Sequence, residues 1–451
     1  MPRSDGQTTL PVESTQGALS REQGLALRWV FPDHTRPPTV LSTARIVLGR
    51  GENCDASLPG TEISREHAEI RRDGPLFILR DLQSRNGVFV RGVRLNEAPL
   101  EAGDVLRLGE WVGVVVPAGS VGPGRAFRRI AGRLLGGPVL ADALELGLRA
   151  AKSDLPILIE GETGTGKELT AQALHELSGR KGPFVGVNCA ALPEALAEGE
   201  LFGYRRGAFT GAERASIGFF RAAQHGTLLL DELTDLPLSL QAKLLRVLEE
   251  HQVVPLGEST PVALDVRVIA ATQQPLSEAV SEKRFRADLL ARLHGLTIAL
   301  PPLRQRREDV GYVVQELLRE HSGGHSPELD ARFVEALCTH DWPFNVRELD
   351  LLVRRVLVLH GHEAVLKRTH LPAALRGESA ARSRPAEGVD RDEHELSQLV
   401  ACLRKHKGNV ARAAADVGIS RQRAYRLMES RGDVDLDAFR GAPPANRGTS
   451  S

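Results

Sequence analysis

A glycine-rich run near the middle of the chain contains residue types that bind phosphate groups. Residues 161–168 read GETGTGKE and follow the apolar segment 157–160. Glycines let backbone N–H groups converge on phosphate oxygens, a lysine adds a point charge, and a following helix directs its positive end to the same place. The run predicts a nucleotide-binding loop made of Gly161, Glu162, Thr163, Gly164, Thr165, Gly166, Lys167 and Glu168.

Two carboxylates at the end of a later apolar run are suited to metal binding and water activation in nucleotide hydrolysis. Leu228-Leu-Leu-Asp231-Glu232 has the pattern of a buried strand that ends in acidic residues. Asp231 is suited to hold Mg²⁺ directly or through water, and Glu232 to orient or deprotonate an attacking water. Together with the glycine-rich loop, these residues predict a nucleoside triphosphatase that uses ATP and Mg²⁺. Glu168 stands where a metal-binding Ser or Thr is usual, so that hydroxyl ligand is absent.

The elements that must position these residues belong to the central part of the chain. In residues 130–303, strand-like apolar segments alternate with helical stretches, which favours a parallel α/β sheet. Only helical patterns follow in residues 304–375, so we expect a helical lid subdomain there. Residues 376–392 are charged, contain Ser, Pro and Gly, and lack periodicity, which indicates a linker.

The two ends of the chain have sequence patterns that differ from that of the central part. Residues 25–116 contain short apolar runs separated by turn residues, which predict an all-β sandwich. We expect a disordered tail in 1–24, a linker in 117–129, a small all-α domain in 393–435 and a second disordered tail in 436–451. The fold class is therefore multidomain: an all-β sandwich, an α/β ATPase with a helical lid, and a small helical domain.

Composition limits the class of protein. The chain has 451 residues with 58 Lys and Arg against 58 Asp and Glu, so any nucleic-acid-binding surface must be local. No stretch approaches the ~20 apolar residues that span a bilayer, and the start of the chain lacks the pattern of a secretory signal. Four cysteines without metal-ligand spacing indicate neither a disulfide framework nor a zinc site. These features predict a soluble, cytoplasmic protein without a membrane partner.

The central region resembles the AAA+ activators of sigma-54 RNA polymerase, the bacterial enhancer-binding family. The resemblance is carried by GAFTGA at 207–212, FVGVNCAAL, FRADLLARL, LPPLRQRREDV and WPFNVREL. The family also has Glu after the lysine of the phosphate loop. The resemblance implies a ring, a hexamer in the family, and a loop that touches sigma-54 and moves during the nucleotide cycle. That loop consists of Gly207, Ala208, Phe209, Thr210, Gly211 and Ala212.

Further roles follow from the resemblance. It makes Asn188 a sensor that restrains the catalytic glutamate, and Arg286 and Arg292 the residues that act on the neighbouring subunit's nucleotide. It makes Arg347 a second sensor that faces ATP. Two positions depart from the family: Gln273 replaces the asparagine of the first sensor, and Phe344 replaces a glycine. We expect these departures to affect rate and coupling rather than the type of reaction.

The segment 402–431 has the pattern of a basic helix-turn-helix. An Ala-rich helix, a glycine turn at Gly418 and a second helix carry many more Arg and Lys than acidic residues. The pattern resembles the Fis-type domain that ends sigma-54 activators, which implies binding to enhancer DNA. The residues at the start of the second helix are the candidates for this contact: Ser420, Arg421, Gln422, Arg423 and Arg426.

The N-terminal segment resembles a forkhead-associated (FHA) domain. The resemblance is carried by three motifs that occur in the family order: GR at 49–50, SREH at 64–67 and DLQSRNG at 81–87. FHA domains recognise phosphothreonine, so the resemblance implies a phosphothreonine-containing protein or a Ser/Thr kinase as a partner. Candidate phosphate contacts are Arg50, Ser64 and Arg65, with Asn86 and Arg85 for the peptide backbone and flanking residues.

Three hypotheses about function remain at this point. The first is a sigma-54-dependent activator whose ring hydrolyses ATP to remodel the polymerase closed complex, under control of phosphothreonine recognition. The second is an FHA-controlled DNA-binding regulator with weak or no ATPase activity that acts as a repressor or scaffold, which Gln273 favours. The third is a chaperone-like remodeller of other substrates, for which the basic helix-turn-helix is unnecessary.

Overall fold

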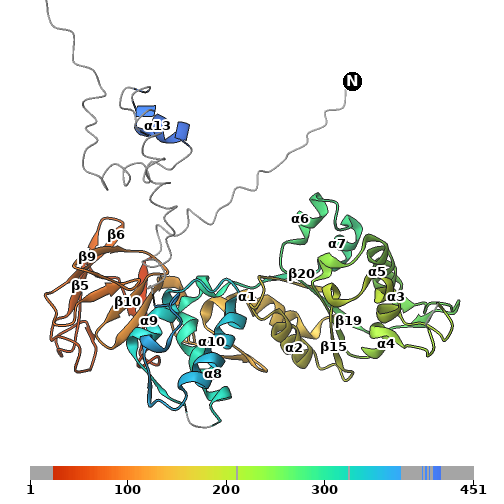
Figure 1. Cartoon of the computed structure of the whole chain (residues 1–451), viewed down its shortest axis with the longest axis horizontal. Helices are drawn as coiled ribbons and strands as arrows, with labels where there is room; N and C mark the ends of the chain where they lie inside the picture. Colours follow the sequence, from red (N-terminus) through yellow and green to blue (C-terminus); the bar gives the residue numbers. More distant parts are fainter. Residues whose placement is uncertain are drawn as a thin grey trace, which may run out of the picture. The chain divides into compact units, whose positions relative to one another are not determined.

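A computed structural model describes residues 24–209, 212–323, 326–376, 399, 402–403, 406 and 410–417. The chain divides into two compact units, Met1–Leu371 and Pro372–Ser451. The first unit holds the β-sandwich, the α/β core and the helical lid (Figure 1). The predicted N-terminal tail, most of the linker 376–392 and the tail 436–451 lie outside the described residues.

The N-terminal domain is a sandwich of two sheets. One sheet has six strands in the order β2–β1–β11–β10–β7–β8, and the other has five in the order β4–β3–β5–β6–β9. Trp29 and Trp111 meet edge to face in the core between the sheets, with ring centroids 5.5 Å apart. The strands are β1 (Leu25–Phe31), β2 (Thr39–Val40), β3 (Arg45–Gly49), β4 (Ala56–Ser57), β5 (Ala68–Asp73), β6 (Leu76–Asp81), β7 (Val88–Val90), β8 (Val93–Leu95), β9 (Glu97–Leu100), β10 (Val105–Leu108) and β11 (Trp111–Pro117).

An ordered segment joins the sandwich to the α/β core. It contains the short 3-10 helix η1 (Ala118–Ser120) and a two-stranded antiparallel hairpin of β12 (Arg128–Ala131) and β13 (Leu134–Gly136). Residues 117–129, predicted as a linker, thus include a 3-10 turn and the first residues of β12. The helix α1 (Pro138–Arg149) follows, with a proline in its first turn where no backbone N–H partner is needed.

The central domain is built on a five-stranded sheet in which all pairings are parallel. The order is β15–β16–β19–β14–β20, with Ile157 of β14 opposite Ile269 of β19. Alternate residues of β16 pack on opposite faces: Leu228 and Leu230 face one hydrophobic cluster and Leu229 the other. Both faces are therefore covered, as parallel sheets require. The strands are β14 (Ile157–Glu160), β15 (Phe184–Asn188), β16 (Thr227–Asp231), β19 (Arg267–Thr272) and β20 (Leu296–Ala299).

Helices and short turns connect these strands. The helices are α2 (Lys167–Ser178), α3 (Glu194–Phe202), α4 (Gly218–Ala222), α5 (Leu238–Glu250), α6 (Leu276–Ser281) and α7 (Ala287–Leu293). The short elements are η2 (Ala150–Lys152), η3 (Cys189–Ala191), η4 (Leu233–Asp235) and the antiparallel pair β17 (Gln252–Val253) and β18 (Val262–Ala263).

The lid follows the last strand of the sheet and is mainly helical. Its helices are α8 (Val310–His321), α9 (Ala331–Thr339) and α10 (Asn345–His360), preceded by the 3-10 turns η5 (Leu303–Gln305) and η6 (Arg307–Asp309). A small parallel pair, β21 (Glu328–Leu329) and β22 (Val365–Leu366), and the turn η7 (Arg368–His370) complete it. The sandwich, the α/β core and the helical lid confirm the predicted fold class for these regions.

The second unit contributes one described helix, α13 (Val410–Val417), within the predicted helical domain 393–435. Before it, the His406 ring nitrogen Nε2 lies 2.7 Å from a carboxylate oxygen of Asp416. The second helix of the predicted helix-turn-helix lies outside the described residues. Among the helices that the structure does describe, none has the length and hydrophobicity needed to cross a membrane.

Candidate functional site

The glycine-rich loop connects β14 to α2 at the carboxyl edge of the parallel sheet. Gly164 and Gly166 have φ angles of +79° and +106°, which other residues adopt only with strain. A Cβ at Gly164 would lie 2.2 Å from the carbonyl oxygen of Phe344 in the lid, so a side chain there would collide with backbone. The loop therefore needs glycine both for its own turn and for the close approach of the lid.

Lys167 begins α2 and points back into the loop. Its Nζ donates a hydrogen bond to the carbonyl oxygen of Gly161 at 2.9 Å and lies 3.5 Å from Oε1 of Glu232. The lysine side chain is only 6 % exposed. The ammonium group thus lies between the phosphate loop and the end of β16, where it can exchange these partners for phosphate oxygens.

The two predicted acidic residues lie at the carboxyl end of β16. Glu232 has a left-handed φ of +51°, and its backbone N–H donates to Oδ1 of Asp231 at 3.0 Å. Such a conformation in a non-glycine residue is typical of a functional site. Burial raises the pKa of Asp231, Lys167 opposes this shift, and the negative charges of Glu232 and Glu168 add to it. Mg²⁺ at phosphate sites typically uses one or two protein carboxylates, and Asp231 is the candidate here.

The two expected sensors adjoin these carboxylates. Parallel pairing places Asn188, the last residue of β15, directly beside Asp231. The Asn188 side chain caps the next turn by accepting from the N–H of Ala190 at 3.0 Å. The contact to the catalytic glutamate that was expected of Asn188 is made here by Gln273, whose Nε2 donates to Oε1 of Glu232 at 2.9 Å. Gln273 therefore contacts Glu232, the predicted catalytic residue, although it departs from the family asparagine.

The lid contacts the phosphate loop through residues that the sequence analysis did not select. Asn345 is fully buried, and its Nδ2 donates to the carbonyl of Thr163 at 3.0 Å and to Glu162 at 3.2 Å. Arg304 pairs with Glu162 through two hydrogen bonds of 2.8 and 2.6 Å, which holds the pKa of Glu162 below its usual range. The WPFNVREL motif pointed to this place, but its asparagine could not be assigned a partner from sequence.

A buried arginine and the predicted second sensor adjoin the same loop. Arg306 is 2 % exposed and donates to the carbonyl of Thr165 at 3.3 Å. The Cβ of Arg347 would lie 2.9 Å from a Cβ built on Gly164, so this predicted sensor is beside the loop. With Arg304, the lid therefore borders the loop with three arginines, of which Arg306 is buried and Arg347 is exposed.

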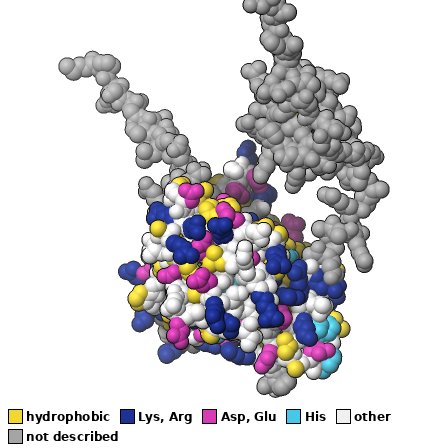
Figure 2. Space-filling view, turned by 90° about the vertical axis from the view of Figure 1, so that its left-hand side faces the viewer, with side chains coloured by type: hydrophobic (Ala, Val, Ile, Leu, Met, Phe, Trp, Pro, Cys, Tyr) yellow, Lys and Arg dark blue, Asp and Glu magenta, His cyan; other side chains and the backbone are white. Residues whose placement is uncertain are grey.

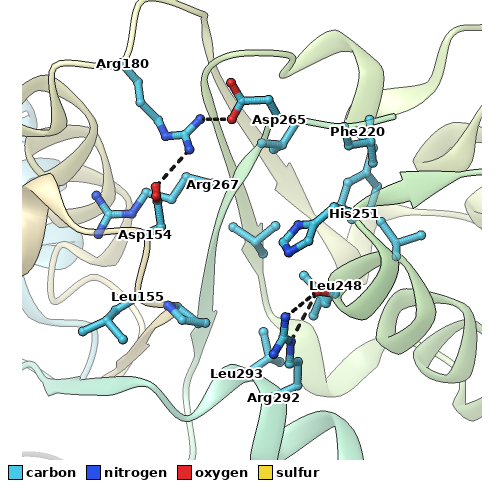
Figure 3. Close-up of a pocket in the computed structure, with 15 residues that line it drawn as sticks. Asp154, Leu155, Arg180, Phe220, Leu248, His251, Asp265, Arg267, Arg292 and Leu293 are labelled. Carbon is cyan, nitrogen blue, oxygen red and sulfur yellow. Dashed lines mark hydrogen bonds and ion pairs between the residues drawn. The ribbon is translucent and has the colours of Figure 1, made fainter. Parts of the chain in front are cut away.

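The two predicted trans-acting arginines lie on and near α7. Arg286 precedes the helix, is exposed, and pairs with Asp288 at 2.6 Å. Arg292 donates to the carbonyl of Leu248 at 3.2 and 3.0 Å and borders a pocket of ≈ 700 Å³ (Figure 3). That pocket includes Asp154 before β14 and Arg267 at the start of β19, so it lies at the amino edge of the sheet, opposite the phosphate loop.

The loop that was predicted to contact sigma-54 projects between α3 and α4. Phe209 is 37 % exposed, and its ring lies 5.0 Å from that of Tyr204. The loop closes on itself through a hydrogen bond of 2.9 Å from the N–H of Gly207 to the carbonyl of Ala212. Ala208 lies against Gly257. Thr210 and Gly211 lie outside the described residues.

Three loops of the sandwich meet where the phosphothreonine-binding residues were predicted. The N–H of Arg50 donates to the carbonyl of Ser64 at 2.9 Å, and Oγ of Ser64 accepts from the N–H of Arg85 at 3.1 Å. Asn86 donates from Nδ2 to the carbonyl of Glu62 at 2.7 Å. Within the described part of the chain, the guanidinium groups of Arg50, Arg65 and Arg85 form no hydrogen bond or ion pair. The loops therefore offer several unengaged cations in one place.

A buried histidine holds these loops together. His67 is fully buried, with Nδ1 accepting from the N–H of Ser64 at 3.1 Å and Nε2 lying 3.1 Å from the carbonyl of Gly87. Burial lowers the pKa of His67, so the ring is neutral at physiological pH. On the face viewed in Figure 2, Lys and Arg side chains are spread among acidic ones. The charges on this face do not form one continuous basic field.

The predicted DNA-binding residues Ser420, Arg421, Gln422, Arg423 and Arg426 lie outside the described residues, so the structure gives no account of their positions.

Comparison with known proteins agrees with this architecture. Residues 136–299 match the sigma-54 interaction domain, residues 46–109 the FHA domain, and residues 304–388 an AAA+ ATPase lid domain. The chain is 41% identical over 307 residues to the transcriptional regulatory protein GlrR of Escherichia coli K12, covering 67% of this chain and 68% of that relative. It is 39% identical over 311 residues to the regulatory protein AtoC of the same organism, covering 66% and 67%.

A solved structure is similar to about two thirds of this chain. NtrX from Brucella abortus in complex with ADP has a TM-score of 0.51 and 32% identity, and the match covers 66% of this chain and 70% of that chain. The fold and site thus define an AAA+ ATPase preceded by an FHA domain. The chain belongs to the family of sigma-54-dependent bacterial transcriptional regulators. The predicted family, ATPase class and FHA domain are confirmed.

Proposed function

We propose that this chain assembles into a ring, a hexamer as in its family, that hydrolyses ATP to remodel the sigma-54 RNA polymerase closed complex. The observation that carries the proposal is the convergence of Lys167, Asp231 and Glu232 beside the phosphate loop, in a chain that also presents the Phe209 loop. The reaction converts ATP and water into ADP and phosphate. Its energy drives the movement of the loop.

The residues divide the work of hydrolysis. Lys167 leaves the carbonyl of Gly161 and the carboxylate of Glu232 to bind phosphate oxygens. Glu232, released from that ion pair, orients the attacking water and accepts its proton. Gln273 holds the Glu232 carboxylate at 2.9 Å and fixes its direction. Asp231, with the Glu168 and Glu232 charges near it, would hold Mg²⁺, which supplies charge neutralisation at the phosphates.

The trans-acting arginines support the assignment of a ring. Arg292 borders the amino edge of the sheet, whereas the phosphate loop of the same chain lies at the carboxyl edge. Arg286 is exposed, and within the described residues its guanidinium pairs with its near neighbour Asp288 alone. An arginine placed in this way can stabilise charge on a γ-phosphate only when it belongs to the adjacent subunit. Head-to-tail contacts that close produce such rings.

The proposed partners follow from the C-terminal domain and from the Phe209 loop of the central domain. The C-terminal residues Ser420–Arg423 and Arg426 would bind enhancer DNA and hold the ring near its promoter. The Phe209 loop would touch sigma-54. We place the protein in the cytoplasm because polymerase and promoter DNA are located there.

The experiment that tests this function is promoter opening at a sigma-54-dependent promoter by the purified full chain and sigma-54 holoenzyme. We expect open complexes with ATP and none with a non-hydrolysable ATP analogue.

We further propose that the sandwich binds phosphothreonine through Arg50, Ser64 and Arg65. Arg50→Ala is expected to weaken binding to a phosphothreonine peptide library at least tenfold, because a charge-assisted hydrogen bond contributes about 1.5–3 kcal/mol. Arg80→Ala is the control, since Arg80 lies on strand β6 and is 51% exposed. Fluorescence anisotropy with phosphorylated and unphosphorylated peptides makes the measurement. Equal binding of the two peptide sets, or an unchanged affinity of Arg50→Ala, would contradict the proposal.

A further inference from the structure

Three adjacent strands of the six-stranded sheet of the FHA domain, β1, β11 and β10, are buried on both of their faces. A sandwich strand ordinarily buries alternate residues and exposes the others, yet β1, β10 and β11 carry uninterrupted buried runs. The apolar residues of these strands that face away from the sandwich core are at most 3% exposed: Ala26, Val30, Val105, Val112, Val114 and Val116. The elements that cover them belong to the ATPase lid, namely α8, α9 and η6. In Figure 1, α9 lies beside β10.

A buried ion pair lies within this contact. Nε of Arg107 on β10 donates to Oε2 of Glu335 on α9 at 2.6 Å, and the two side chains are 5% and 2% exposed. The Arg107 guanidinium also lies 3.7 Å from the ring centroid of Phe89. Two ions removed from water need each other, because either one left alone in this position is strongly unfavourable. The contact between the FHA domain and the lid is therefore stable only when both domains are placed so that Arg107 meets Glu335.

Further contacts join the FHA domain and the joining segment to the start of α8. The Tyr312 hydroxyl donates to the carbonyl of His34 at 3.0 Å, and its ring stacks on Phe127 at 4.1 Å. Arg28 of β1 is 7% exposed, and its charge favours the ionised forms of Glu308 and Asp309. Burial raises the pKa of both carboxyls, that of Glu308 to about 7. The buried charges of the lid therefore face a cation supplied by the FHA domain.

The same short stretch of the lid reaches the nucleotide loop. Asp309 lies 3.6 Å from the guanidinium of Arg306, and Arg306 donates to the carbonyl of Thr165. All the side chains of this path, from Arg28 through Asp309 to Arg306, are at most 7% exposed. A displacement of the FHA domain would remove Arg28 from Asp309 and uncover η6. The Arg306 contact to the phosphate loop would then lose its support.

We propose that the β1–β11–β10 face of the FHA domain is a docking surface for the ATPase lid, through which the position of the FHA domain sets the affinity for ATP. The inference rests on the ATP binding of the proposed function. Because binding linkage is reciprocal, ATP also changes the affinity of the FHA domain for its phosphothreonine ligand whenever that ligand shifts the docked state.

The test measures the affinity of the full chain for a fluorescent ATP analogue. We expect Arg107→Ala and Glu335→Ala each to weaken binding at least fivefold, since each leaves a buried charge unpaired. The double variant R107M/E335M replaces the pair with apolar side chains of similar length and should bind within twofold of the parent chain. Arg80→Ala, on the exposed side of the same domain, is the matched control and should also bind within twofold.

Hydrogen exchange in β10 and α9 reports whether the contact has opened. Faster exchange in both β10 and α9 with an unchanged ATP affinity would overturn the proposal. It would also be overturned if neither Arg107→Ala nor Glu335→Ala accelerated exchange in these elements. Should Arg107→Ala fail to fold, Tyr312→Ala opens the same contact from the lid and should weaken binding at least threefold; unchanged binding there also overturns it. Absence of nucleotide binding by the parent chain would instead contradict the proposed ATPase.

Discussion

Glu232→Gln is expected to abolish ATP hydrolysis while ATP binding is retained. Glutamine keeps the size of the side chain and can still accept from Gln273, but it cannot take a proton from water. General-base catalysis contributes roughly 100- to 10,000-fold to a rate, so hydrolysis should fall by at least about 100-fold. Lys167, free of its ion pair with the carboxylate, should bind nucleotide as well or better. Phosphate release and analogue binding measure the two effects.

Glu145→Gln provides the control for this prediction. Glu145 lies on α1 with its side chain 66% exposed, and its loss should leave hydrolysis unchanged. A Glu232→Gln chain that hydrolyses ATP at the parent rate would show that another group acts as the base. A parent chain that binds ATP without hydrolysing it would favour the alternative of a DNA-binding regulator, with Gln273 holding Glu232 in an inactive position.

Phe209→Ala is expected to abolish promoter opening while ATP hydrolysis stays within about threefold of the parent rate. Phe209 is 37% exposed and contacts the ring of Tyr204, so it contributes little to the core. It lies between α3 and α4, away from the residues that surround Lys167. Loss of a buried aromatic anchor at an interface costs about 2–4 kcal/mol, which is a loss of roughly 30-fold or more in binding.

Ile217→Ala is the matched control, because Ile217 is 56% exposed at the far end of the same connection. It should leave both activities near those of the parent. Promoter opening by Phe209→Ala at the parent level would remove this loop from the mechanism. Parallel loss of hydrolysis and opening would mean that the loop acts on the nucleotide site rather than on polymerase.

The parts of the site that consist of residues adjacent in the sequence could be predicted from sequence. The phosphate loop and the Asp231–Glu232 pair are local patterns, and parallel pairing at one sheet edge brings them together. The contact from Gln273 to Glu232 joins residues 41 positions apart, and no local pattern specifies its geometry. Asn345 and Arg306 were missed for the same reason: their partners are carbonyl groups of a distant loop, which any sequence supplies.

The type of each domain could be predicted from the sequence, but the contacts between the domains could not. Alternation of strand and helix patterns indicated the parallel sheet, and short strands with turn residues indicated the sandwich. The uninterrupted apolar run Trp111–Val116 indicates a strand buried on both faces, because it lacks the alternation of a half-exposed strand. The prediction of the sandwich did not use this pattern. The partner for that second face, a lid more than 200 positions later, could not be inferred because Glu335 alone resembles any helical surface glutamate.

We propose above all that ATP hydrolysis by this chain drives sigma-54 polymerase to open a promoter. Permanganate footprinting of the melted DNA, with purified full chain and holoenzyme, tests it most directly. We expect a melted region with ATP, and none with a non-hydrolysable analogue or with the Glu232→Gln chain. Melting with the analogue, or no melting with ATP under conditions in which the chain hydrolyses it, would contradict a mechanism driven by hydrolysis.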